Sequence, residues 1–277
     1  MPELPEVETI RSALENGGRE GSAIIGLRVD YAELLWQRTL AVPDEAAFLT
    51  RIHGQVVCRV RRRAKYLDIC LESDHLLMHL RMSGDVRVEP HSAAQQKHDR
   101  LVIWFEGGQK LVFNDPRKFG RVWFVQDPDE VLLGLGPEPL AESFTTEFFF
   151  ARLQKHNRRL KPLLMDQAFL AGMGNIYTDE ALFMAKLHPL TIASTLSIEE
   201  AEDLRIAIVT VLLEGIRRNG ASIDWVYRGG SFQNVFQVYG RGGEFCNICG
   251  TPIARIVVGQ RGTHFCPQCQ PLKLPEN

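Results

Sequence analysis

Hydrophobic residues near the start of the chain recur at helical spacing. Val7, Ile10 and Leu14 are three and four positions apart, and an Asn-Gly-Gly sequence follows at residues 16–18. This spacing places apolar side chains on one face of a helix, and asparagine and glycine commonly end one. The pattern therefore predicts a helix that ends near residue 16.

The region from residue 23 to residue 125 favours β-strands instead. Branched and apolar residues gather in short runs over residues 56–71 and 76–88. Two further runs, residues 101–105 and 111–113, are separated by a pair of glycines, which predicts a hairpin. A helix followed by many antiparallel strands predicts a β-sandwich with attached helices.

The pattern changes again after residues 134–139, a stretch rich in glycine and proline that stops both helix and strand and predicts a linker. Helical spacing returns over residues 145–153, 163–170 and 179–185. Further on, Ser197 and Glu200 predict a capping box at the start of a longer helix. One face of that helix is apolar and carries Ala201, Leu204, Ile208, Val211, Leu212 and Ile216.

Composition narrows the picture by exclusion. Hydrophobic residues make up 45% of the 277 residues and charged residues 24%, which excludes a disordered chain. There is no run of about 18 apolar residues that would span a membrane. The acidic, proline-containing start does not resemble a secretory signal, so a cytoplasmic location is expected. The net charge of −2 argues mildly against a nucleic-acid partner unless basic residues are clustered.

The six cysteines include two Cys-x-x-Cys pairs separated by sixteen residues: Cys246, Cys249, Cys266 and Cys269. Such pairs fit a tetrahedral zinc site of four thiolates, with buried free cysteines or a redox pair as the alternative. Four protein ligands leave no open position, so the sequence predicts one structural Zn²⁺. The other two cysteines, Cys58 and Cys70, lie in apolar runs and are predicted to be small core residues.

Basic residues are clustered despite the near-neutral total charge. Runs lie at residues 61–65, 117–118, 157–161 and 217–218. Each alone is typical of a solvated face, but together, with aromatic residues nearby, they favour a groove that follows a nucleic-acid backbone. Between the cysteine pairs, Arg261 stands in a glycine-rich loop, where a tight turn would project its guanidinium toward a phosphate.

Two further segments could carry chemistry. Residues 172–175 hold two glycines and an asparagine, which form either a helix–helix turn or an anion site at a helix N-terminus. Pro2 follows Met1, and removal of Met1 would leave a secondary amine that is partly unprotonated at neutral pH. Such an amine can attack an electrophilic carbon, with Glu3 and Glu6 as acid or base partners. Helix-start preferences alone would explain the same three residues.

Together these features resemble the formamidopyrimidine-DNA glycosylase family of base-excision repair enzymes, over essentially the whole chain. The motifs that carry the resemblance are PELPEV (residues 2–7), RRAKYL (62–67), HLRMSG (79–84), DPRKFG (115–120), LGPEPL (135–140), DQ (166–167), GNIY (174–177), QVYGR (237–241) and the four-cysteine finger with Arg261.

The resemblance implies an α+β fold with DNA in a cleft between two halves. The N-terminal half is a β-sandwich with flanking helices, and the second half is a helix–two-turn–helix domain followed by a four-cysteine zinc-finger hairpin. The implied segments are the catalytic domain (residues 1–133), the linker (134–144), the helix–two-turn–helix domain (145–240) and the zinc finger (241–277).

The resemblance also implies residue roles in a bifunctional glycosylase and abasic-site lyase. The Pro2 amine attacks C1′ of an oxidised purine nucleotide, and β- and δ-elimination from the Schiff base cut the strand. Catalytic roles are implied for Pro2, Glu3, Lys65 and Arg261, and a lesion-pocket role for Glu6. Met82, Arg117 and Phe119 fill the gap that a flipped base leaves. Contacts with DNA are implied for Met82, His98, Arg117, Phe119, Lys161, Asn175 and Arg261.

The implied partner is damaged double-stranded DNA, bound by a cytoplasmic, bacterial monomer that is nucleoid-associated when on DNA. The connection over residues 221–231 is shorter and bulkier than in many relatives, with Trp225 and Tyr227, so the ranking of base lesions stays open. Alternative functions are an endonuclease VIII-like glycosylase for oxidised pyrimidines, a non-catalytic lesion-binding protein and a zinc-ribbon RNA-binding module. The presence of Pro2, Glu3 and Lys65 argues against a non-catalytic protein.

Overall fold

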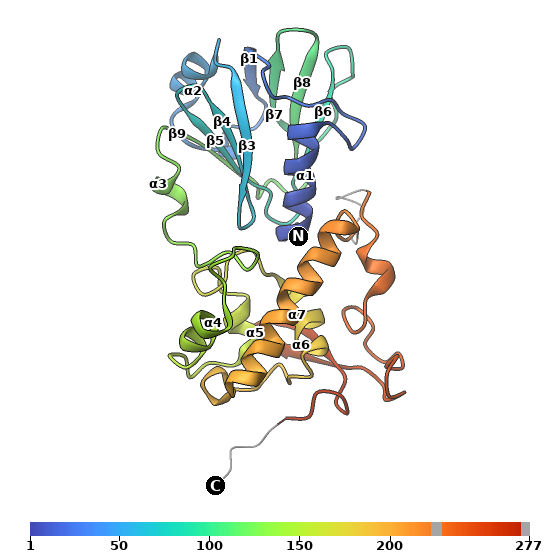
Figure 1. Cartoon of the computed structure of the whole chain (residues 1–277). Helices are drawn as coiled ribbons and strands as arrows, with labels where there is room; N and C mark the ends of the chain where they lie inside the picture. Colours follow the sequence, from blue (N-terminus) through green and yellow to red (C-terminus); the bar gives the residue numbers. More distant parts are fainter. Residues whose placement is uncertain (223–228, 273–277) are drawn as a thin grey trace. The chain divides into compact units, whose positions relative to one another are not determined.

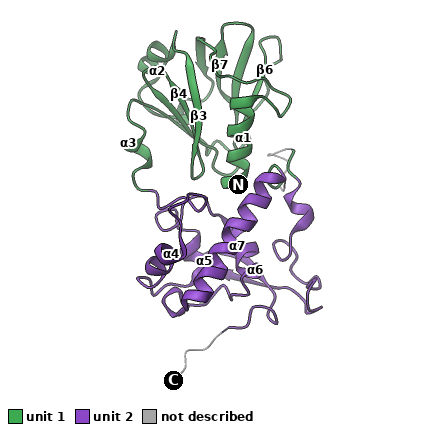
Figure 2. Ribbon diagram, viewed as in Figure 1, with its two compact units in different colours: residues 1–134, 219–230 green, residues 135–218, 231–277 purple. Residues whose placement is uncertain are grey.

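The computed structural model describes residues 1–222 and 229–272. The chain divides into two compact units (Figure 2). Unit 1 comprises residues 1–134 and 219–230, and unit 2 comprises residues 135–218 and 231–277. Residues 219–230 thus belong with the N-terminal unit, although they follow a long helix of unit 2 in the sequence.

Unit 1 is a β-sandwich with helix α1 (Leu4–Asn16) packed against it (Figure 1). One sheet has the strand order β2-β9-β5-β4-β3 and the other the order β1-β7-β8-β6. Neighbouring strands are antiparallel except β2 and β9, which run parallel. The strands are β1 (Val29–Leu34), β2 (Leu40–Val42), β3 (Val57–Arg63), β4 (Tyr66–Leu71), β5 (His75–His79), β6 (Asp85–Pro90), β7 (Asp99–Phe105), β8 (Gln109–Asn114) and β9 (Arg121–Val125).

The core of unit 1 lies between the two sheets. Side chains alternate across each strand, so β4 contributes Leu67 and Ile69 while β7 contributes Leu101 and Ile103 from the opposite sheet. Val7 lies in the same cluster, on the face of α1 that the sequence predicts to be apolar. The predicted N-terminal helix, the β7–β8 hairpin and the sandwich are therefore confirmed.

Unit 2 is helical and ends in a two-stranded hairpin. Its elements are α4 (Thr146–Leu153), α5 (Leu160–Leu164), α6 (Asn175–Met184), α7 (Ile198–Arg217), β10 (Ala254–Val258) and β11 (Arg261–Phe265). Helix α7 starts with the predicted capping box, in which Ser197 and Glu200 bond each other's backbone N–H groups at 3.1–3.2 Å. A Cβ at Gly215 would lie 2.5 Å from Tyr177, so this glycine lets α7 approach α6 closely. The α+β class is confirmed.

The helix expected over residues 163–170 is shorter and starts earlier. Helix α5 ends at Leu164, and turns follow it. The Gln167 side chain donates to the carbonyl oxygens of Met165 and Met173, each at 2.8 Å. Such bonds between side chain and backbone compete with helical ones, which apolar spacing does not reveal.

Two further features of unit 1 differ from the expectations. Cys70 is buried as predicted, but Cys58 is exposed, so its predicted core position is wrong. It lies on the edge strand β3, where the register shifts between Val57 and Arg59. Helix α2 (Glu45–Ile52), which Asp44 caps, interrupts the strand-rich region, and the short α3 (Asp129–Leu132) follows it. In the described parts of the chain, no helix combines the length and apolar character needed to cross a membrane.

Candidate active site and nucleic-acid interface

Helix α1 begins at the residues expected to carry the reaction. Pro2 is buried directly before Glu3, the N-cap residue, and Glu3 and Glu6 are each only 2% exposed. One carboxylate oxygen of Glu6 accepts a hydrogen bond from the backbone N–H of Glu3 at 2.7 Å. The other accepts from the backbone N–H of Ala221 at 2.8 Å. Glu6 therefore holds the start of the chain against residues 219–222 of the same unit.

Lys65 lies in the tight turn between β3 and β4. The turn consists of Ala64, whose φ of +53° is in the left-handed region, and Lys65, whose side chain is buried. Arg62 joins this turn to α1, because it donates to the Ala64 carbonyl at 3.1 Å and to the Glu8 carboxylate at 2.8 Å. The turn and the start of α1 lie at the same end of unit 1 (Figure 1).

His79 is a neighbour of this site whose role the sequence did not reveal, although it stands in the HLRMSG motif. Its ring packs edge-on against Tyr66 with the centroids 4.6 Å apart, and its Nδ1 accepts from the backbone N–H of Arg81 at 3.0 Å. Burial, followed by the charges of Arg81 and Lys65, lowers the pKa of His79 to about 3. The imidazole is therefore neutral at physiological pH, with its proton on Nε2.

Two neighbouring loops carry the residues expected to fill a vacated base position. Met82 lies between β5 and β6, and Arg117 and Phe119 lie between β8 and β9. Phe119 is 52% exposed, and the Arg117 guanidinium lies 5.0 Å from its ring centroid. The carbonyl of His98 accepts from the backbone N–H of Asp115 at 2.8 Å, so His98 borders the same region. The structure thus brings all four of these predicted DNA contacts together.

In unit 2, Asn175 is the first residue of α6. Its side-chain nitrogen donates to the Gly262 carbonyl of β11 at 3.1 Å, next to Arg261. Lys161 is 0% exposed, and its ammonium donates to the Asn175 carbonyl at 2.9 Å and to the Asp179 carboxylate at 2.6 Å. The structure therefore places Lys161 behind Asn175 rather than on the surface, and a direct DNA contact by Lys161 stays a prediction.

Two adjacent acidic residues of α6 hold the C-terminal segments in place. The second oxygen of Asp179 accepts from the backbone N–H of His264 on β11 at 2.9 Å. Glu180 accepts from three consecutive backbone N–H groups, residues 237–239, at 2.8–3.0 Å. The QVYGR motif and the hairpin are thereby fixed to α6. Sequence reasoning missed both acidic residues, and the signal that could have found Asp179 is its spacing of one helical turn from Asn175.

Arg261 follows a two-residue turn in which Gly259 and Gln260 both have positive φ, +55° and +62°. Two left-handed residues make the type of turn that suits a tight hairpin. Arg261 itself is exposed at the start of β11. The predicted projection of its guanidinium from a tight turn is consistent with this geometry, and its phosphate contact stays a prediction.

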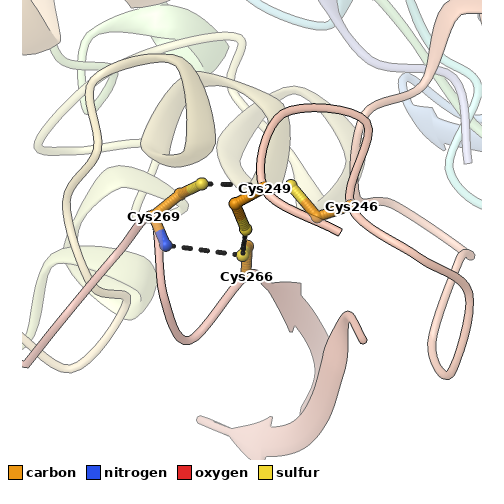
Figure 3. A group of neighbouring side chains, drawn as sticks. All are labelled: Cys246, Cys249, Cys266 and Cys269. Atoms are coloured by element: carbon orange, nitrogen blue, oxygen red, sulfur yellow. Dashed lines mark hydrogen bonds between the residues drawn. The ribbon is translucent and has the colours of Figure 1, made fainter. Parts of the chain in front are cut away.

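The four cysteines of the two Cys-x-x-Cys pairs lie together beside this hairpin (Figure 3). The sulfur atoms of Cys246 and Cys269 are 3.9 Å apart, and those of Cys249 and Cys266 are 3.4 Å apart. Backbone N–H groups of Ile248 and Cys269 donate to Sγ of Cys246 and Cys266, each at 3.4 Å. Hydrogen bonds from Thr251 lower the pKa of Cys249 to about 6. Four thiolates fit one structural Zn²⁺ and would leave no coordination position for a substrate or water.

A second group of metal-binding residue types has a simpler explanation. Asp68, Cys70 and His75 lie close together on β4 and β5. Asp68 already pairs with His75 at 2.7 Å, and burial followed by Asp68 raises the pKa of Cys70 to about 12. Arg59 and Arg61 lie opposite Cys70 and Asp68 on β3, and their charges disfavour a cation.

Comparison with known proteins covers the chain from end to end. Three family models match: the formamidopyrimidine-DNA glycosylase N-terminal domain over residues 1–122, its H2TH domain over 135–226, and the zinc finger found in FPG and IleRS over 243–272. The formamidopyrimidine-DNA glycosylase of Herpetosiphon aurantiacus is 43% identical across 98% of this chain and 100% of its own length.

Solved structures agree with this result. Lactococcus lactis Fpg bound to DNA containing FAPY-dG is 36% identical, has a TM-score of 0.89, and is matched over 98% of this chain and 100% of that one. MutM in complex with DNA containing carbocyclic 8-oxo-G is 37% identical, with the same TM-score and coverage. The sequence motifs, the sandwich, the helical unit and the four-cysteine finger thus converge on one assignment. This chain belongs to the formamidopyrimidine-DNA glycosylase family.

Proposed function

We propose that this protein is a bifunctional DNA glycosylase and abasic-site lyase that removes oxidised purines from double-stranded DNA. The observation that carries the proposal is the start of α1. There a proline that becomes N-terminal when Met1 is removed lies beside two buried carboxylates, and Arg62 ties the Lys65 turn to the same helix. Relatives of this fold were crystallised with DNA that contains FAPY-dG or carbocyclic 8-oxo-G, which supports the substrate class.

The Pro2 amine is the nucleophile of the first step. It precedes the N-cap of α1 by one residue. Its lone pair attacks C1′ of the damaged nucleotide, the glycosidic bond breaks, and the base leaves with a proton. The amine then gives up its proton, the bond from C1′ to O4′ breaks, and O4′ takes up a proton. The product is an iminium that joins the protein to the opened sugar.

Elimination then cuts the strand on both sides of the sugar. Loss of a proton from C2′ breaks the bond from C3′ to its phosphate, and a second elimination breaks the bond at C5′. Glu3 acts as the acid and base at the sugar, and Glu6 supports the pocket. The Lys65 ammonium stabilises negative charge beside the lesion.

The remaining predicted residues bind and deform the duplex. Arg261 and Asn175 contact backbone phosphates, and His98 and Lys161 assist binding directly or by positioning. Met82, Arg117 and Phe119 enter the stack when the base flips out, with Arg117 facing the orphaned cytosine. The zinc site holds the hairpin that presents Arg261 and takes no part in the chemistry.

Reductive trapping tests the nucleophile. Borohydride reduces an iminium but leaves a non-covalent complex untouched, so the mature chain should form a covalent adduct with duplex DNA that contains an abasic site. A chain that retains Met1 should form none, because its amine belongs to Met1. As the control, both forms should bind a tetrahydrofuran analogue, which cannot form a Schiff base, with similar Kd. Normal trapping with Met1 retained would assign the nucleophile elsewhere, with Lys65 as the next candidate.

A panel of lesions separates this function from the pyrimidine-specific alternative. We expect faster excision of ring-opened guanine and 8-oxoguanine than of thymine glycol, with an abasic duplex as the reference for lyase activity. The opposite order would favour the endonuclease VIII-like function. Trp225 and Tyr227, which bear on the ranking between the two purine lesions, lie outside the described residues.

The proposed place of action is the nucleoid of a bacterial cytoplasm, because the substrate is chromosomal DNA. A fluorescent protein fused to the C-terminus leaves the Pro2 amine free. Its signal should coincide with a DNA stain after oxidative damage.

A further inference from the structure

The loops that carry Met82, Arg117 and Phe119 cross between the same two sheets in opposite directions. The Met82 loop (residues 80–84) leaves β5 of the five-stranded sheet and enters β6 of the four-stranded sheet. The Arg117 loop (residues 115–120) makes the reverse crossing, from β8 to β9. Their ends are paired, His79 with Arg121 and Asp85 with Asn114. The two loops therefore run side by side although they are far apart in the sequence.

Asp115 joins the two loops. Its side chain is buried, with 1% of the residue exposed. One carboxylate oxygen accepts from the Ser83 hydroxyl of the Met82 loop and from the backbone N–H of Arg117 at 3.1 Å. The other accepts from the backbone N–H of Gly120 at 2.7 Å. The Ser83 oxygen in turn accepts from the Arg117 N–H at 3.2 Å.

Both loops hold a strained residue directly before an inserting side chain. Arg81 precedes Met82 with φ of +53°, and Lys118 precedes Phe119 with φ of +61°. Non-glycine residues keep such a conformation only where surrounding contacts determine it. The Asp115 bonds to residues 117 and 120 enclose Lys118, whose ammonium lies 3.8 Å from the ring centroid of Trp36.

Both loops pack against the same buried side chain, Phe113. A Cβ at Gly84 would lie 2.8 Å from the ring of Phe113, and a Cβ at Gly120 would lie 2.3 Å from the same ring. Both loops therefore pack against the ring of one buried phenylalanine, and glycine is needed at both positions.

We propose that Asp115, with Ser83, is a positioning residue that locks the Met82 and Arg117 loops into one wedge before DNA is bound. Asp115 is too deeply buried to touch DNA, so it acts through the side chains that it positions. A preformed wedge avoids the entropy cost of ordering both loops during base flipping. This inference rests on the proposed function, because it concerns how that function reaches a stacked base.

The test compares duplex and single-stranded substrates. Asp115→Asn and Ser83→Ala should slow single-turnover cutting of a duplex with 8-oxoguanine opposite cytosine by about ten- to a hundredfold. Cutting of a single-stranded abasic oligonucleotide, which needs no unstacking, should change by less than about twofold. Ser83→Thr keeps a hydroxyl and should restore the duplex rate. Asp74→Asn is the matched control, since Asp74 is also a buried carboxylate of unit 1 that accepts from arginine.

A second measurement does not depend on cutting. The emission of 2-aminopurine placed opposite a tetrahydrofuran analogue should rise when the wild-type wedge unstacks it, and should rise less with Ser83→Ala. A wild-type chain that gives this signal but cuts no lesion refutes the proposed function and leaves the wedge intact. Equal losses on both substrates, or wild-type behaviour of both Asp115→Asn and Ser83→Ala, would overturn the wedge.

Discussion

Three buried carboxylates, those of Glu6, Asp115 and Asp179, each hold chain segments that are far apart in the sequence. Glu6 joins the start of α1 to Ala221, and Asp179 joins Lys161 to the β11 hairpin. A buried carboxylate is costly unless hydrogen-bond donors surround it, so each fixes its partners firmly. At the residue scale, each of these carboxylates therefore positions other residues of the site.

His79 gives this unit a predictable response to acid. Its folded-state pKa of about 3 lies below the unfolded value of 6.5, so the unfolded chain takes up the proton first. Its contribution to stability is complete above about pH 6.5 and is lost as pH falls toward 3. Between about pH 7 and pH 5, wild type should lose about 2 kcal/mol more than His79→Asn, whose Oδ1 can replace the Nδ1 acceptor. Urea unfolding followed by tryptophan emission measures this, with His91→Asn as the surface control.

Replacing Arg261 or Arg117 by alanine should have different effects on DNA binding and on cutting. Arg261→Ala removes the proposed phosphate contact, so it should weaken binding to every duplex and reduce the salt dependence of log K by roughly 0.9. Arg117→Ala should slow processing of paired lesions and spare single strands, because only a duplex has a partner base to satisfy. The same loss factor for both variants on both substrates would contradict this division of roles.

At the scale of elements, the hairpin β10–β11 depends on metal more than on its own core. Val257 is 70% exposed, and the buried cluster around Cys246 and Cys266 has few members. Cys249→Ser should therefore unfold the hairpin and remove most DNA affinity while unit 1 keeps its structure. Metal analysis should find one zinc per wild-type chain. Retained DNA affinity in the chelated protein would show that the finger does not position Arg261.

Local signals predicted those elements whose cause is local. The capping box at Ser197, the glycine pair between β7 and β8, and the spacing within each Cys-x-x-Cys pair act within a few residues. The missed features depend on partners far away in the chain. Cys58 is turned outward by a register shift, and Asp115 meets Ser83 only because two strand crossings run side by side. The burial of Lys161 likewise follows from Asp179, not from its basic neighbours in the sequence.

For the whole molecule, two compact units with separate cores should unfold separately. Unit 1 relies on the sandwich core, whereas the end of unit 2 relies on zinc. In calorimetry, a strong chelator should lower the unfolding temperature of unit 2 relative to the metal-bound chain. The unfolding temperature of unit 1 should stay unchanged. A single transition that shifts as a whole with chelation would show instead that the two units unfold cooperatively.

The shared phenylalanine floor has a consequence for anyone who recombines members of this family. Gly84 and Gly120 both approach the ring of Phe113, and the Ser83 hydroxyl donates to the Asp115 carboxylate between the two loops. A single loop grafted from a donor would pack against a Phe113 ring and a second loop whose sequences are not those of the donor. Chimeras that exchange residues 80–84 and 115–120 together with Phe113 should inherit the donor's lesion handling, whereas single-loop grafts should lose it. At this end of the sandwich, the two loops therefore have to be exchanged together for the donor's properties to be transferred.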